Sequence, residues 1–247
     1  MIPARWRALF RLLEVQAAWT YERMAGIGVG HAAEPLLREL DGARDEGARR
    51  AAVARSAEYF NSHPYLAGVA VGAVVRAERD GVPGPTISRL RTALSGPLGS
   101  LGDQLIWAGE VPALMGAALA LVPVVGWWSV LLVPVVHNVL RLRLTLWGLD
   151  LGLREGLGVG GALERSRLPR LAGDAQRVAA WAVGFGVPVA AAWLLEDADP
   201  WLAAAAVGCA LVGVVLMLAP GTRTRVTGMR FGLALLLLTL LAIGGAQ

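Results

Sequence analysis

Long apolar runs from residue 104 onward constrain this chain more than any other feature of its sequence. A helix that crosses a bilayer needs about 20 predominantly apolar residues, and several of these runs approach that length with few or no charges. The mean hydropathy of +0.54 and an apolar share of 55% agree with them. The sequence therefore predicts an all-α integral membrane protein. We expect about five transmembrane helices, over residues 105–122, 124–140, 178–195, 201–219 and 231–246.

The first two predicted spans carry polar residues. Glu110 lies in the first span, and His137 and Asn138 lie near the end of the second. Polar groups at membrane depth are tolerated where they face protein or a water-filled cavity. Glu110 has the strongest claim to an unusual environment, whereas snorkelling or a bond between helices accounts for His137 and Asn138.

Arginine placement predicts the orientation of the spans. All 23 basic residues are arginines; 13 lie before residue 104 and seven lie in residues 141–177, whereas residues 196–200 hold three acids and no base. Arginine excess marks the cytoplasmic side. We expect a cytoplasmic or interfacial helical region over residues 1–103 and a transmembrane region over residues 104–247, with a cytoplasmic loop at about 141–177. The N-terminus is then inside and the C-terminus outside, and the dispersed arginines form no patch for nucleic acid.

Two stretches of the N-terminal region allow alternative interpretations. Residues 4–25 have an amphipathic pattern, which suits a helix on the membrane surface or a helix packed on a soluble core. The ten apolar residues 66–75 are too short to span a bilayer. They suit half of a re-entrant hairpin or a buried core helix, and periodicity does not separate the two.

The stretch SGPLGSLGDQLIW, residues 95–107, places a glycine at every third position just before the first predicted span. Glycine permits close backbone approach and positive φ angles, so the spacing predicts a tight turn or re-entrant hairpin that leaves Asp103 at a membrane boundary. The alternative is a glycine-rich helix entry with Asp103 as its N-cap. The residues assigned to the hairpin are Gly96, Pro97, Gly99 and Gly102.

Three other stretches accompany this one: AAWTYERM at 17–24, EYFNSHPY at 58–65 and NVLRLRLTLWGLDLG at 138–152. In this order they resemble the IID subunit of the mannose-family sugar phosphotransferase system, whose members carry W-x-YERM, FN-[ST]-HPY and GPL-x-x-[IL]-GD at similar separations. The resemblance covers about residues 5–160 well and the remainder loosely. The chain departs from it in AAWTYERM, which replaces GSWNYERM, and in a short EDADP connection at 196–200, so the sugar stays open.

The resemblance implies a translocation subunit in the bacterial inner membrane. Such a subunit forms an obligate pair with a IIC subunit within a symmetric oligomer, and together they bind and transport a hexose of the mannose class. The phosphate passes through separate IIA and IIB components, so no catalytic residue is expected on this chain. The sequence also lacks nucleotide motifs and metal-ligand spacing, and no cofactor or metal is expected. The alternative is a regulatory or scaffold relative that no longer moves sugar.

Sugar hydroxyls are recognised by convergent amide, carboxylate and imidazole groups, because an unmatched polar group in a dry site is costly. The motif positions make Asn61, His63, Asp103 and Glu22 the candidate substrate-binding residues. Each also has a structural interpretation. Glu22 suits an interfacial ion pair with its neighbour, Asn61 and His63 suit a cap before a proline, and Asp103 suits a turn or N-cap.

Overall fold

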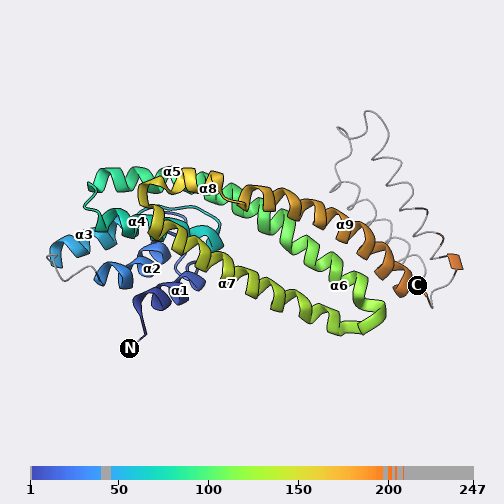
Figure 1. Ribbon diagram of the computed structural model, residues 1–247. Coiled ribbons are helices and arrows are strands. Elements are labelled where there is room, and N and C mark those ends of the chain that lie inside the picture. Colours follow the sequence, from blue (N-terminus) through green and yellow to red (C-terminus); the bar gives the residue numbers. More distant parts are fainter. Residues whose placement is uncertain (1, 40–45, 197–199, 202–203, 205–207, 209–247) are drawn as a thin grey trace. The chain divides into compact units, whose positions relative to one another are not determined.

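The computed structural model describes residues 2–39, 46–196, 200–201, 204 and 208, and its elements are helices (Figure 1). Residues 1–189 form one compact unit and residues 190–247 a second. Short 3₁₀ turns at Pro64–Leu66, Gly126–Trp128 and Gly156–Gly158 and a π-helical turn at Ile106–Glu110 join some of the helices. The α-helices are α1 Ala4–Leu13, α2 Gly26–Arg38, α3 Glu46–Ser56, α4 Ala67–Arg79, α5 Gly84–Leu105, α6 Val111–Val125, α7 Ser129–Glu155, α8 Val159–Arg165 and α9 Leu168–Leu194.

Helix α4 forms the centre of the N-terminal core. Eleven of its 13 residues are buried, and the exceptions are Arg76 and Arg79 near its end. It packs along α7 and also contacts α2 and α5. The ten apolar residues at 66–75 are therefore a buried core helix, the second of the two interpretations that the sequence allowed.

Glycines on both partners let α4 and α7 approach each other closely. A Cβ atom added to Gly72 would lie 2.4 Å from the carbonyl oxygen of Leu149, and one added to Gly152 would lie 2.2 Å from that of Val69. Such distances leave no room for a side chain on either helix. Small residues at a helix interface allow this backbone contact, which brings more atoms within dispersion range.

The turn predicted within residues 95–107 is wrong. Helix α5 runs without a break from Gly84 to Leu105, so Gly96, Pro97, Gly99 and Gly102 are helical. The chain reverses earlier, at residues 80–83, where Gly81 has a φ of 73°. Asp103 lies in the last turn of α5 and is therefore not an N-cap. The predicted boundary between the interfacial region and the transmembrane region, after residue 103, falls inside α5. The division into these two regions stays a prediction.

The N-terminal amphipathic pattern yields a shorter helix than the sequence suggested. Helix α1 ends at Leu13 and packs on α2; Ala8 and Leu12 are buried, while Trp6 and Phe10 remain exposed. One face is therefore packed on the protein and the aromatic face is open. This arrangement is compatible with an interfacial position for the open face.

Among the described residues, two segments are long and apolar enough to cross a membrane, one within residues 84–165 and the other at Leu168–Leu194. They contain the first two predicted spans and all but the last residue of the third. The first span covers the π-helical turn and most of α6, the second lies mainly on α7 and the third on α9. Figure 1 shows α6 and α7 meeting at a turn, where Trp127 and Trp128 stack and are exposed. The fourth predicted span falls almost entirely, and the fifth entirely, outside the described residues.

Candidate functional site

Two of the motif stretches meet through backbone hydrogen bonds. The Ala25 amide donates to the carbonyl of Phe60 at 3.0 Å, and the Phe60 amide donates to the carbonyl of Arg23 at 3.3 Å. Met24, which lies between these partners, has a φ of 50°. The end of YERM is thus bonded to the start of FNSHPY, although more than 30 residues separate them in the sequence. We call residues 57–63 the junction loop.

Helix α5 carries the third motif stretch and holds the junction loop from the other side. The Asn61 amide donates to the Ser95 hydroxyl oxygen at 3.1 Å, and the Ser95 hydroxyl donates to the Asn61 carbonyl. One turn earlier, the guanidinium of Arg91 donates to the carbonyls of Ser56 and Glu58, both at 2.9 Å. The YERM stretch and α5, both distant from the junction loop in the sequence, therefore converge on it.

Arg91 is an unusual residue for a helix core, because only 2% of it is exposed. Its guanidinium lies 5.5 Å from the centre of the Phe60 ring and 3.6 Å from the Glu58 carboxylate. Burial lowers the pKa of Arg91 to about 10, so the side chain stays charged at neutral pH. A buried charge that binds carbonyl groups fixes the path of the loop.

A groove of 540 Å³ lies between the junction loop and α5. Asn61 lines it from the loop and Asp103 from the helix, so the structure brings together two of the predicted site residues. A Cβ atom at Gly96 would meet nothing within 4 Å, and one at Gly99 would meet only the Ser62 Cα atom at 3.9 Å. These two glycines therefore border open space. The remaining lining residues are Tyr59, Ser95, Ser100 and Gln104.

The groove continues toward the π-helical turn. A neighbouring depression is lined by Asp103 and Gln104 again and by Trp107 and Ala108. Trp107 is largely exposed, so its ring and the polar side chains border the same space. Sequence reasoning did not single out Trp107; its position four residues after Asp103, on the same helical face, was the available signal.

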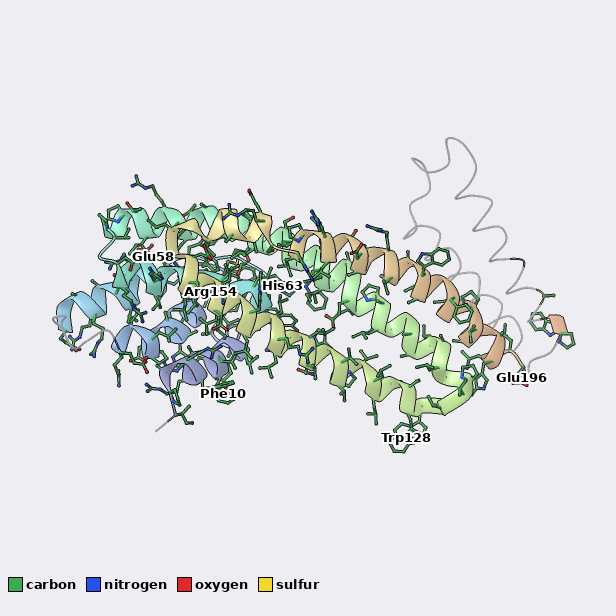
Figure 2. The ribbon with its side chains drawn as sticks, in the orientation of Figure 1. Phe10, Glu58, His63, Trp128, Arg154 and Glu196 are labelled. Carbon is green, nitrogen blue, oxygen red and sulfur yellow. The ribbon has the colours of Figure 1, made fainter. Side chains whose placement is uncertain are left out.

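His63 is buried and packs on α5 at Gly102, next to the groove residue Asp103. Figure 2 shows it in the interior of the molecule. A Cβ atom at Gly102 would lie 2.1 Å from the His63 Cβ, so Gly102 is the motif glycine that permits close packing. The His63 Nδ1 accepts a hydrogen bond from the Tyr65 amide at 3.3 Å, and its ring caps the 3₁₀ turn. Burial lowers the pKa of His63 to about 4, and the ring is neutral at pH 7. This arrangement is the cap that the sequence offered as one interpretation.

Glu22, the remaining predicted site residue, is exposed on the loop between α1 and α2. It does not line the groove. The structural interpretation of Glu22, an ion pair with Arg23, is likewise not found among the ion pairs of the described residues. The structure therefore brings together Asn61 and Asp103, packs His63 on α5 next to Asp103 and leaves Glu22 on the adjoining loop.

A second polar cluster ties the start of α4 to the apolar helices. The His137 Nδ1 lies 3.1 Å from one carboxylate oxygen of Glu110, and its Nε2 lies 2.8 Å from the Tyr65 hydroxyl. The Arg141 guanidinium lies 5.1 Å from the centre of the Tyr65 ring and donates to the Leu13 carbonyl. Glu110 is only 9% exposed, and His137 is its partner from another helix. Two of the three polar residues of the first two predicted spans thus satisfy each other, as expected for polar groups at membrane depth.

Sequence reasoning missed Tyr65 and Arg141 as members of this cluster. Arg141 follows His137 by four residues and so shares its helical face, which was the available signal. Asn138, by contrast, donates its side-chain amide to the Pro134 carbonyl of its own helix at 2.8 Å. Within the described part of the chain, no group of three or more His, Cys, Asp or Glu side chains is placed to hold a metal ion.

A family model described as the phosphotransferase-system mannose/fructose/sorbose family IID component matches residues 3–188. The chain belongs to this family. The matched region contains all the stretches on which the resemblance rested, and the predicted family is confirmed. As a IID component, the chain is a helical membrane protein of the sugar phosphotransferase system.

Curated relatives of this IID chain share somewhat over a quarter of their aligned residues with it. The mannose-specific EIID component of Escherichia coli K12 is 28% identical over 162 residues, which cover 61% of this chain and 56% of that protein. The fructose permease IID component of Bacillus subtilis is 29% identical over 175 residues, covering 68% and 62%. The sorbose-specific EIID component of Lacticaseibacillus casei is 30% identical over 151 residues, covering 58% and 52%. The alignments thus span between half and two thirds of the length of these relatives.

Two solved structures share the fold of the IID chain. One is the cryo-EM structure of the mannose transporter ManYZ in complex with microcin E492, with a TM-score of 0.52 and 24% identity over 81% of this chain and 72% of that one. The other, described as a membrane protein, has a TM-score of 0.66 and 20% identity over 100% of this chain and 96% of that one.

Proposed function

We propose that this IID chain is the translocation subunit of a phosphoenolpyruvate-dependent sugar phosphotransferase system. It binds and transports a hexose of the mannose class together with a IIC subunit, and a separate IIB component phosphorylates the sugar. The IIA component supplies phosphate to IIB. Relatives whose names specify mannose, fructose and sorbose support this substrate class.

The groove between the junction loop and α5 is the observation that carries the proposal. It offers the Asn61 amide, the Asp103 carboxylate and the Gln104 amide along one surface, next to the Trp107 ring. Hydroxyl groups of a hexose pair with such amides and carboxylates, and the apolar face of the sugar ring packs on an aromatic ring. Its volume of 540 Å³ lies within the range of small-molecule sites.

Movement of the sugar requires that the groove be coupled to the membrane helices. The hydrogen bond between Tyr65 and His137 and the pairing of His137 with Glu110 link the N-terminal core to α7 and to the start of α6. These bonds add a polar link to the close packing of α4 on α7. A rigid-body movement of one part against another then exposes the sugar to IIB.

The partners and location follow from the same proposal. Apolar side chains are exposed along α6, the first half of α7 and α9, and this surface suits lipid or a IIC subunit. We place the chain in the bacterial inner membrane in an obligate pair with IIC, within a symmetric oligomer of such pairs. The arginine distribution supports an N-terminus on the cytoplasmic side and a C-terminus outside.

Uptake of labelled mannose, driven by phosphoenolpyruvate, tests the proposal in vesicles that contain this chain and its A, B and C partners. Asp103→Asn is expected to raise the apparent KM by about 10- to 100-fold, because a hydrogen bond to a charged group is lost. Asp80→Asn is the matched control, since Asp80 lies outside the groove and pairs with Arg76. Its uptake should match that of the unmodified chain.

His63→Ala separates packing from sugar contact. Because His63 is buried and does not line the groove, this variant should mainly lower the thermal stability of the complex. The KM for the sugar should rise only slightly. A complex that assembles but takes up no hexose of any kind would overturn the translocation proposal. That result would favour a regulatory or scaffold role.

A further inference from the structure

An apolar cavity of 780 Å³ lies among α5, α6, α7 and α9, apart from the polar groove. We propose that this cavity binds an anionic phospholipid, with an acyl chain against its apolar walls and the phosphate at Arg143 and Arg167. The walls include Trp147 and Leu171. This inference does not rest on the sugar-binding proposal, because the two sites have no lining residue in common.

The charges around the cavity select an anion. The side chains of Arg143 and Arg167 line it and form no hydrogen bond or ion pair with any described residue. The two acidic groups in the wall already have partners: Glu110 lies 3.1 Å from His137, and Asp174 lies 2.9 Å from Arg177. The two arginines are therefore the available charges, and a phosphate matches them.

The position of the cavity along the helices suits a lipid rather than a soluble anion. Arg143 lies 15 residues beyond Trp128 on α7, a distance of about 22 Å along a helix, against a hydrocarbon core of about 30 Å. Trp128 projects from the turn between α6 and α7 (Figure 2), and tryptophans of this kind lie at headgroup level. Arg143 is then just inside the opposite boundary, where a long side chain reaches headgroup phosphates.

The walls complete the match to a lipid. Leu140, Leu171 and Val178 line the cavity and are also exposed at the protein surface, so the cavity is open to the surrounding lipid. An acyl chain in this space buries apolar surface on both sides. Arginine pockets between membrane helices on the cytoplasmic side are where anionic headgroups bind, and the arginine distribution places residues 141–177 on that side.

Photolabelling tests the proposal with the full chain and its IIC partner in phosphatidylcholine liposomes. The probe is phosphatidylglycerol with a diazirine on its acyl chain, and the reference probe is phosphatidylcholine with the same label. We expect phosphatidylglycerol to label cavity-lining peptides roughly tenfold more than phosphatidylcholine does. The ratio should fall to near one in the variant that combines Arg143→Gln with Arg167→Gln.

Two further variants keep the test decisive. Arg170→Gln removes an exposed arginine close by that does not line the cavity, and the labelling ratio should stay unchanged. Leu171→Trp keeps both arginines and narrows the cavity, so labelling by both probes should fall. This variant decides the outcome if the double variant does not fold.

Several results would overturn the lipid site. One is equal labelling by the two probes. Another is a fall of the labelling ratio in the Arg170→Gln control as large as that in the double variant. A third is no labelling of the cavity, which would mean that a protein segment fills it. Inorganic phosphate that competes with the probe at millimolar concentration would show a site for a soluble anion instead.

Discussion

Replacing Gly102 by alanine puts a methyl group where His63 already lies. The new Cβ would be 2.1 Å from the His63 Cβ and 2.4 Å from its Cγ, far below van der Waals contact. These atoms lie next to the backbone of a residue that precedes Pro64 and whose ring accepts a backbone hydrogen bond. The junction loop or α5 must therefore move, since no flexible chain end can turn away.

The steric cost of Gly102→Ala in unfolding free energy can be isolated by comparison with Gly96→Ala on the same helix. Both substitutions gain about 1 kcal/mol of helix propensity, and this gain cancels in the difference. A Cβ at Gly96 meets nothing within 4 Å, so the difference isolates the steric cost at Gly102. Overpacking of this kind costs about 1–3 kcal/mol. For a chain of this size, that corresponds to a Tm difference of about 2–12 °C.

The assay is thermal unfolding of detergent-solubilised protein, followed by the fraction that remains monodisperse in gel filtration. Gly96→Ala should match or exceed the stability of the unmodified chain, and Gly102→Ala should be less stable. Gly99→Ala should resemble Gly96→Ala, because its only neighbour within 4 Å is the Ser62 Cα at 3.9 Å. His63→Ala should not rescue Gly102→Ala, since the two Cβ atoms still collide.

Equal Tm values for Gly102→Ala and Gly96→Ala would refute this reasoning. They would mean that α5 does not pack on His63 as the structure shows. If residues 95–107 formed a tight hairpin, Gly99→Leu would be expected to abolish assembly or uptake. The structure changes the expected cause, because a leucine at Gly99 would point into the groove and should impair sugar uptake before it impairs assembly.

Three other perturbations have definite outcomes. Gly72→Leu should lower the free energy of unfolding by more than about 3 kcal/mol and leave little monodisperse protein, since its Cβ would lie 2.4 Å from a carbonyl oxygen of α7. Gly160→Ala is the control, because a Cβ there meets nothing within 4 Å, and its stability should match that of the unmodified chain. Arg91→Met should lower the free energy of unfolding by about 1.5–3 kcal/mol and accelerate protease cleavage in the junction loop. An unchanged cleavage rate would contradict the conclusion that Arg91 fixes the path of this loop. Because burial holds the pKa of His63 near 4, below its usual 6.5, the unfolded chain binds more protons between these values. Stability should therefore be nearly full above about pH 6.5 and fall by about 2 kcal/mol at pH 5. His63→Gln should flatten this loss in thermal unfolding measured against pH.

Much of the candidate site could be predicted because its residues belong to compact motifs. Asn61 and Asp103 were singled out from the sequence, and the structure places both in one groove. The turn at residues 95–107 was predicted wrongly because glycine and proline favour turns in isolation. In the folded chain, α5 packs on α4 and the junction loop, and this contact outweighs the local preference.

The sequence by itself determined the class of the molecule and its family. Length and polarity of the apolar runs depend on local composition, and the motif stretches are read directly from the chain. The tertiary structure decided which faces meet. Only it shows that Gly102 rather than Gly99 contacts His63, and that Tyr65 bonds His137. Periodicity encodes which side of a helix is buried, but the partner of that side depends on every other element in the fold.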